Sequence, residues 1–213
     1  MTDSVGKSME TSLVENERFE KIIAAVVDKG IYIEENFLSR SLIPEINDWF
    51  TDLTLNGKFK KARIGPSSES HLNTQIRNDE IYWINEYPDR LIELETFMEK
   101  LMIQINSNLF LNLKRGEFHL SQYPIGHFYA KHLDQSKLTK NRLITFLLYF
   151  NPEWGNEDHG ELIVYDPINN DKEILQITPS WGKLVIFRSD KFFHEVRPTL
   201  KTRRALSGWY RND

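Results

Sequence analysis

The sequence predicts an α+β fold in which helices come first and a jelly-roll-like β-core follows. Apolar residues recur at helical spacing in the first half of the chain. After residue 109 the pattern changes to short segments rich in β-branched and aromatic residues, separated by turn residues. About eight such segments favour an antiparallel sandwich or barrel over a parallel sheet with helical crossovers. We therefore expect a disordered tail over residues 1–13 and a single domain over 14–213, with helical support in 14–110 and the β-core in 111–213.

Three helices are predicted before the β-core. The first spans Leu13–Asp28, and the second is capped by Ser39 or Ser41 and ends at Asn56. Pro88 opens the third. The apolar residues of this third helix fall at helical spacing and predict a face packed on the sheet, namely Leu91, Leu94, Met98, Leu101 and Ile105.

The β-core is predicted from short β-rich segments that are separated by turn residues, and a short extended piece at 31–33 precedes it. The predicted strands are Glu117–Tyr123, Phe128–Asp134, Arg142–Phe150, Glu161–Tyr165, Glu173–Ile177, Lys183–Arg188, His194–Arg197 and Arg203–Tyr210.

Composition excludes several classes of protein. The chain has no cysteine, which rules out disulfide scaffolds, thiolate metal sites and cysteine nucleophiles, so any metal must be held by His and carboxylate. A net charge of -4 argues against general nucleic-acid binding. No apolar run is long enough to cross a bilayer, and the polar N-terminus does not resemble a secretory signal. We expect a cytoplasmic protein with neither nucleic-acid nor membrane partners.

Four residues form a candidate site for a metal ion and a carboxylate ligand. His132 and Asp134 stand two positions apart on a predicted strand, where both side chains point to the same face. His194 begins a later strand, and Arg203 follows nine residues beyond it. Two histidines and one carboxylate form the ligand set of non-haem Fe(II) oxygenases. An arginine at a fixed offset suits the far carboxylate of 2-oxoglutarate, because its planar fork binds a carboxylate in bidentate fashion.

With these residues in place, the sequence resembles 2-oxoglutarate- and Fe(II)-dependent prolyl hydroxylases of the hypoxia-sensing type and their bacterial relatives. The resemblance runs from about Ala62 to Tyr210. Its motifs, in order, are Gln75–Asp79 with Trp83, Tyr123-Pro124, Tyr129–Asp134, Arg142 with Thr145 and Tyr149, Gly160–Leu162, His194–Val196, and Arg203 with Trp209. Asn78 stands where relatives typically have glycine, and Lys58–Thr74, where relatives carry a mobile loop, matches poorly.

The resemblance implies a double-stranded β-helix (cupin-like) core and a role for each matching residue. The iron ligands and catalytic centre would be His132, Asp134 and His194. The 2-oxoglutarate site would be formed by Arg203, Tyr149, Tyr123, Thr145, Leu162 and Trp209, with Leu147 in its wall. The substrate side would be formed by Trp83, Tyr129, Arg142 and Asp79, with Asp79 and Arg142 joined as an ion pair.

The implied activity is hydroxylation of a prolyl residue in a protein substrate, with succinate and CO2 as co-products. Fe(II) is the expected cofactor and 2-oxoglutarate the expected co-substrate. Ascorbate is a further candidate cofactor. Elongation factor Tu is a candidate target among those of bacterial relatives.

Two alternatives stay open: hydroxylation of free proline or another small metabolite, and a catalytically silent binding module on the same fold. A cupin-like enzyme without 2-oxoglutarate would not need the Arg203 and Tyr149 pair. The sequence alone decides neither the substrate nor the oligomeric state.

Overall fold

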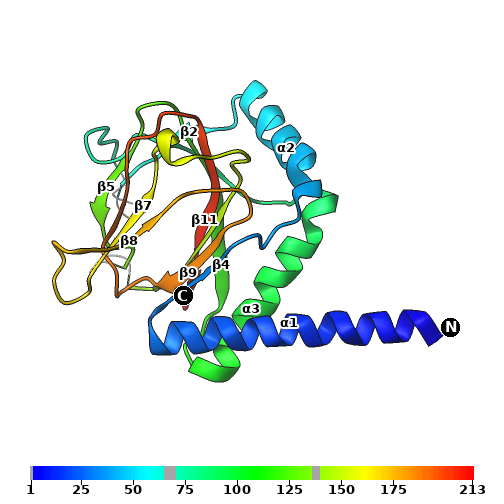
Figure 1. Cartoon of the computed structure of the whole chain (residues 1–213). Coiled ribbons are helices and arrows are strands. Elements are labelled where there is room, and N and C mark those ends of the chain that lie inside the picture. The colour runs from blue at the N-terminus through cyan, green and yellow to red at the C-terminus, as the bar shows by residue number, and fades with distance from the viewer. Residues whose placement is uncertain (1, 65–70, 136–139) are drawn as a thin grey trace.

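The computed structural model describes residues 2–64, 71–135 and 140–213, which form three helices and eleven strands (Figure 1). The helices are α1 (Thr2–Asp28), α2 (Ile43–Leu55) and α3 (Ile92–Leu109). The strands are β1 (Ile31–Glu34), β2 (Lys60–Lys61), β3 (Glu80–Trp83), β4 (Arg115–Tyr123), β5 (Tyr129–His132), β6 (Arg142–Tyr149), β7 (Leu162–Tyr165), β8 (Glu173–Ile177), β9 (Leu184–Arg188), β10 (His194–Val196) and β11 (Arg203–Arg211). No helix in these ranges is long and apolar enough to span a membrane.

Two antiparallel sheets form the β-core. The larger has the order β1-β9-β6-β11-β4-β3-β2, and the smaller has the order β5-β10-β7-β8. Apolar side chains from both sheets meet in one buried cluster, which includes Val185 and Phe187 of the large sheet and Leu162 and Val164 of the small one. This arrangement of helices with a jelly-roll core confirms the predicted fold class.

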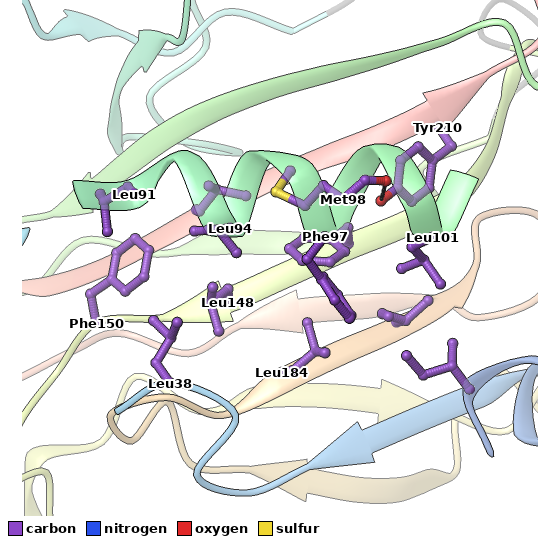
Figure 2. Close-up of a cluster of buried hydrophobic side chains, with 14 of the residues drawn as sticks. Leu38, Leu91, Leu94, Phe97, Met98, Leu101, Leu148, Phe150, Leu184 and Tyr210 are labelled. Carbon is purple, nitrogen blue, oxygen red and sulfur yellow. Dashed lines mark hydrogen bonds between the residues drawn. The ribbon is translucent and has the colours of Figure 1, made fainter. Parts of the chain in front are cut away.

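The helices cover the outer face of the large sheet (Figure 1). Strand β6 shows how alternation separates the two faces: Ile144, Phe146 and Leu148 belong to the helix-side core, whereas Leu147 and Tyr149 belong to the cluster between the sheets. Figure 2 shows α3 lying across the strands with its apolar face turned toward Leu148 and Leu184. This helix face consists of Leu94, Phe97, Met98, Leu101 and Ile105. The helices therefore support the sheet from behind and leave its other face available for a site.

The N-terminal region differs from the predicted disordered tail over residues 1–13. Helix α1 already begins at Thr2 and continues to Asp28. This stretch contains no proline and only one glycine, Gly6, so nothing in it stops a helix that has formed further along. The other predicted helices match α2 and α3, and the extended piece at 31–33 is strand β1.

Strands β2 and β3 were not predicted. Strand β2 contains only two residues, Lys60 and Lys61, both exposed, so it carries no alternating pattern. Strand β3 pairs with β4 through Glu80↔Gln122 and Trp83↔His119. Part of the poorly matching loop Lys58–Thr74 lies outside the described residues, because these exclude 65–70.

Candidate active site

Three potential metal ligands converge between the two sheets. The cross-strand pair His194↔His132 joins β10 to β5, so the two imidazoles start from opposed backbone positions. The Nε2 atoms of His132 and His194 lie 3.6 Å from Asp134 Oδ1 and Oδ2, respectively. Potential ligand atoms of all three residues lie within 4.8 Å of one another, and no other such cluster of His or acidic residues occurs in the described ranges.

Asp134 does not lie on the same strand as His132, although the sequence predicted that it would. Strand β5 ends at His132, and Asp134 sits in the bend that follows. The carboxylate is held there by a hydrogen bond from Thr145 Oγ1 on β6 to its Oδ2 at 2.7 Å, and Thr145 in turn contacts Ser189 Oγ at 2.8 Å. The position of Asp134 therefore depends on a cross-strand contact as well as on its spacing from His132.

The backbone also orients both imidazoles. Nδ1 of His132 is 2.9 Å from the carbonyl of Ala130, and Nδ1 of His194 is 3.1 Å from the carbonyl of Phe192. A carbonyl only accepts, so each Nδ1 carries the proton and each Nε2 presents a lone pair to the cluster. Burial, reinforced by the neighbouring His132, lowers the pKa of His194 to about 4, which keeps this ring neutral and able to bind a metal.

Asp134 is ionised in this environment. Burial raises the pKa of a carboxyl group, but His194, His132 and the Thr145 hydroxyl outweigh that effect and hold the pKa of Asp134 well below its usual range. The cluster thus offers two imidazole nitrogens and one carboxylate oxygen on one side of a cavity. Such a donor set leaves further coordination positions open and fits Fe(II).

A narrow cavity runs from this cluster between the sheets. Nine of the predicted site residues line it: His132, Asp134, His194, Arg203, Tyr123, Thr145, Leu162, Trp209 and Tyr129. Leu147, named as a wall residue, also lines it. Arg77, His119, Val196, Ser207 and Gly208 complete the lining and are not among the predicted site residues. His119 stands four residues before Tyr123 on the same face of β4, so alternation along this strand, counted from Tyr123, could have found it.

Arg203 places a guanidinium in this cavity, away from solvent. It is 2% exposed and packs between the rings of Tyr123 and Tyr149, at 5.0 Å and 4.9 Å from their centroids. Its Nε donates to the carbonyl of Gly160 at 2.8 Å, which leaves the terminal nitrogens for a ligand. Gly160 has φ +72, and a Cβ there would come within 2.9 Å of Thr199 Oγ1, so glycine is required at this turn.

Tyr149 stands behind Arg203 rather than on the cavity wall. Its hydroxyl is buried and has no hydrogen-bond partner of acceptable geometry among the described residues. Burial raises the pKa of Tyr149, and the nearby Arg203 only partly opposes this, so the phenol stays protonated. Arg204, the next residue on β11, points the other way, toward Phe50 and Asn47 on the helix side.

The predicted ion pair between Asp79 and Arg142 is wrong. Asp79 is fully buried and pairs with Arg77, whose Nε and Nη2 donate to its two carboxylate oxygens at 2.6 Å and 2.9 Å. Arg77 lies only two residues from Asp79 in the chain. The bidentate pair between them satisfies the buried carboxylate. Burial lowers the pKa of the Arg77 guanidinium, but its contact with Asp79 outweighs this and raises the pKa.

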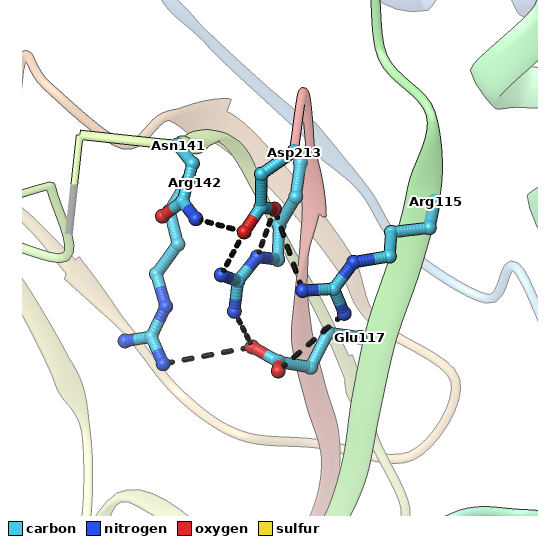
Figure 3. Close-up of polar contacts among 6 residues, drawn as sticks. Arg115, Glu117, Asn141, Arg142 and Asp213 are labelled. Carbon is cyan, nitrogen blue, oxygen red and sulfur yellow. Dashed lines mark hydrogen bonds and ion pairs between the residues drawn. The ribbon is translucent and has the colours of Figure 1, made fainter. Parts of the chain in front are cut away.

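Arg142 takes part in a different arrangement. Its guanidinium lies 3.5 Å from the centre of the Trp209 ring, and its Nη2 is 3.6 Å from Glu117. Figure 3 shows that Glu117 also contacts Arg115. Glu117 forms a further ion pair with Arg211 on β11. The Arg142 guanidinium therefore packs on the Trp209 ring and does not hold the loop that carries Asp79.

The aromatic residues predicted on the substrate side divide into two groups. Tyr129 stacks on His132 with ring centroids 3.6 Å apart, and the Arg77 guanidinium lies over its ring at 4.6 Å. Trp83 is 43% exposed and is not part of the cavity lining; its ring meets His119 edge-on at 4.9 Å. Tyr129 thus links the loop containing Arg77 and Asp79 to a metal ligand, and a substrate role for Trp83 stays a prediction.

Comparison with known proteins identifies the β-core. Residues 118–211 match the family model for the 2OG-Fe(II) oxygenase superfamily. This segment is similar to the 2OG-Fe(II) oxygenase superfamily. It contains all three ligands, Arg203 and most of the cavity wall. The enzyme class and the use of Fe(II) and 2-oxoglutarate expected from the resemblance agree with this match.

Curated relatives extend the similarity beyond the β-core. The chain is 27% identical to mouse Egl nine homolog 1 over 198 residues, which covers 90% of this chain and 49% of the relative. It is 25% identical to human prolyl hydroxylase EGLN3, covering 90% of this chain and 82% of the relative. The chain spans about half the length of the first curated relatives it matches.

Solved structures show the same fold. A Pseudomonas putida prolyl-4-hydroxylase superposes with a TM-score of 0.80 at 28% identity, covering 91% of this chain and 98% of that one. A Trichoplax adhaerens prolyl hydroxylase, in complex with a peptide fragment of the hypoxia inducible factor oxygen degradation domain, gives 0.82 at 26% identity, covering 95% and 92%. The resemblance to prolyl hydroxylases inferred from sequence motifs is confirmed.

Proposed function

We propose that this oxygenase uses Fe(II) and 2-oxoglutarate to hydroxylate a prolyl residue of a protein substrate. The observation that carries the proposal is the single cavity lined at once by the His132–Asp134–His194 cluster and by the buried Arg203. Each feature alone is compatible with other chemistry. Together they provide a metal site and a carboxylate anchor within the same enclosed space.

The residues present fit both groups. His132, Asp134 and His194 would hold Fe(II) through two imidazole nitrogens and one carboxylate. Arg203 would bind the far carboxylate of 2-oxoglutarate, and the Tyr149 hydroxyl beside it is a buried donor that lacks a partner in the described part of the chain. When bound, Fe(II) would activate O2 for C–H hydroxylation: one oxygen atom of O2 enters the substrate and the other enters succinate, as 2-oxoglutarate is oxidised with loss of CO2.

The chain's own contribution is to orient and to exclude water. The Ala130 and Phe192 carbonyls fix the imidazoles, and Thr145 fixes Asp134. Apolar side chains on the cavity wall exclude solvent from the space between the anchor and the metal ligands, namely Leu147, Leu162 and Val196. These fixed groups would aim one substrate C–H at the reactive centre.

A protein substrate is favoured over free proline by the charges near the cavity. A free amino acid brings its own carboxylate, which would need a second buried cation. Arg77 already pairs with Asp79 through two hydrogen bonds, and Arg142 contacts Glu117 and Trp209. The similarity to a prolyl hydroxylase that was solved with a peptide fragment points the same way. Because of the resemblance to bacterial relatives, elongation factor Tu is the first target that we propose to test. We also propose that the protein is cytoplasmic.

The proposal is tested by mass spectrometry of candidate substrates. The purified protein is incubated with Fe(II), 2-oxoglutarate and ascorbate, together with either proline-containing peptides of elongation factor Tu or free L-proline. We expect one added oxygen on a prolyl residue of a peptide, and none with Asp134→Ala. Oxidation of free proline but of no peptide would replace the proposal with the small-metabolite alternative, and 2-oxoglutarate that is neither bound nor consumed would support a silent binding module.

A further inference from the structure

His119 is a buried histidine of the cavity that the proposed function does not use. It lies on β4, is 2% exposed, and its ring sits between Trp83 and Trp209, at 4.9 Å and 5.7 Å between ring centroids. Its Nδ1 atom is fully enclosed and has no hydrogen-bond partner among the described residues. Buried polar atoms in proteins almost always have a partner, so an orphan atom on a cavity wall points to a missing ligand or water.

The imidazole is neutral in this setting. Burial lowers the pKa of His119 well below its usual value, and the positive charges of Arg77 and Arg142 lower it further. A neutral imidazole carries one N–H donor and one lone pair. It can therefore donate to an anionic oxygen without adding a buried charge of its own.

The strand register places His119 toward the metal end of the cavity. On β11, Arg203 is paired with Tyr123 at one end, and Trp209 is paired with Thr145 near the other. Thr145 bonds to Asp134, so the position of Trp209 marks the metal end. His119 is paired with Ser207, which lies four residues from Arg203 and two from Trp209.

The proposal rests on the proposed use of 2-oxoglutarate. With its far carboxylate at Arg203, this molecule must turn its 2-oxo acid end toward His132, Asp134 and His194. A carboxylate that binds a metal through one oxygen keeps a second oxygen that can accept a hydrogen bond. We propose that the His119 imidazole donates a hydrogen bond to the metal-proximal carboxylate of 2-oxoglutarate and is thus a further co-substrate-binding residue.

The experiment uses the Zn(II)-loaded protein, because Zn(II) binds nitrogen and oxygen donors and does not turn over 2-oxoglutarate. Calorimetry measures the Kd of 2-oxoglutarate for wild type, His119→Leu and His119→Gln. A hydrogen bond to a charged group is worth roughly 1.5–3 kcal/mol, so we expect the Kd to rise about tenfold or more in His119→Leu. Glutamine retains a donor, and His119→Gln should recover most of the affinity.

His127 supplies the matched control. Its Nδ1 is also buried and without a partner among the described residues, but the residue is outside the cavity lining. His127→Leu should leave the Kd within about twofold of wild type. A second readout is the ¹⁵N spectrum of labelled imidazoles in the Zn(II) protein, where adding 2-oxoglutarate should shift the His119 signals, assigned from the His119→Gln spectrum, and leave those of His127 in place.

Two results would overturn the assignment. The first is an unchanged Kd in His119→Leu together with unmoved His119 signals. The second is a loss of affinity in Trp209→Phe but not in His119→Leu, because the Trp209 indole N–H is the other buried donor of this wall without a partner in the described ranges. If wild type itself fails to bind 2-oxoglutarate, the proposed function fails, and that outcome is distinct from both.

Discussion

At the scale of single residues, Arg203 is the group that we propose binds the far carboxylate of 2-oxoglutarate. Its guanidinium is buried between two tyrosine rings, and its Nε donates to the carbonyl of Gly160, while no carboxylate of the described residues forms an ion pair with it. We expect Arg203→Ala to weaken 2-oxoglutarate binding roughly 10- to 100-fold, since it removes charge-assisted hydrogen bonds worth roughly 1.5–3 kcal/mol. Calorimetry with the metal-loaded protein measures this loss.

Arg204 is the natural control for that substitution, because it follows Arg203 on β11 but faces the helices. Arg204→Ala should lower the melting temperature and leave the affinity for 2-oxoglutarate close to that of wild type. The opposite pattern, with affinity lost in Arg204→Ala and kept in Arg203→Ala, would show that the wrong face of β11 has been assigned to the co-substrate.

Thr145 acts on the metal through Asp134. Its hydroxyl donates to Asp134 Oδ2 at 2.7 Å, and valine would keep the shape of the side chain but remove this bond. Outer hydrogen bonds to metal ligands typically change metal affinity 10- to 100-fold, so Thr145→Val should raise the Kd for Mn(II) by about tenfold or more. An unchanged Kd, measured by competition with a chelating dye, would mean that Asp134 is held by other contacts.

At the scale of elements, α3 stabilises the sheet that carries the site. Leu101 is fully buried on its sheet-facing side, whereas Ile103, two residues later, is 58% exposed. Leu101→Ala should lower the free energy of unfolding by about 2–5 kcal/mol, and Ile103→Ala should change it by no more than about 0.5 kcal/mol. Urea denaturation followed by circular dichroism compares the two; equal losses would contradict the orientation of the helix.

The elements also show what sequence patterns can and cannot predict. The strands of the β-core could be located because each is a short β-rich segment between turn residues; β7 and most of β9 are buried on both faces and show no alternation of burial. The two-residue strand β2 has too few residues to show any period. The ion pair of Asp79 was misassigned for a different reason: several arginines reach the same region, and the choice between Arg77 and Arg142 depends on loop geometry that no periodicity records.

At the scale of the whole molecule, the helices and the active site occupy opposite faces of one sheet. Strand β11 contributes to both, with Leu206 and Tyr210 in the helix-side core and Arg203, Ser207 and Trp209 in the cavity. The metal ligands come from the opposite sheet and its following bend. The site therefore exists only when the two sheets pack together, and its spacing follows from the register of β11, β4 and β6.

The most direct test of this account is the amount of succinate formed from 2-oxoglutarate in air with Fe(II), measured with a peptide substrate for wild type and for Asp134→Ala. The account predicts succinate from wild type that is abolished by a chelator and by Asp134→Ala, while Asp134→Ala keeps a cooperative thermal transition. Wild type that forms no succinate with any peptide, or Asp134→Ala that forms as much as wild type, would contradict the assignment of this cavity as an Fe(II) and 2-oxoglutarate site.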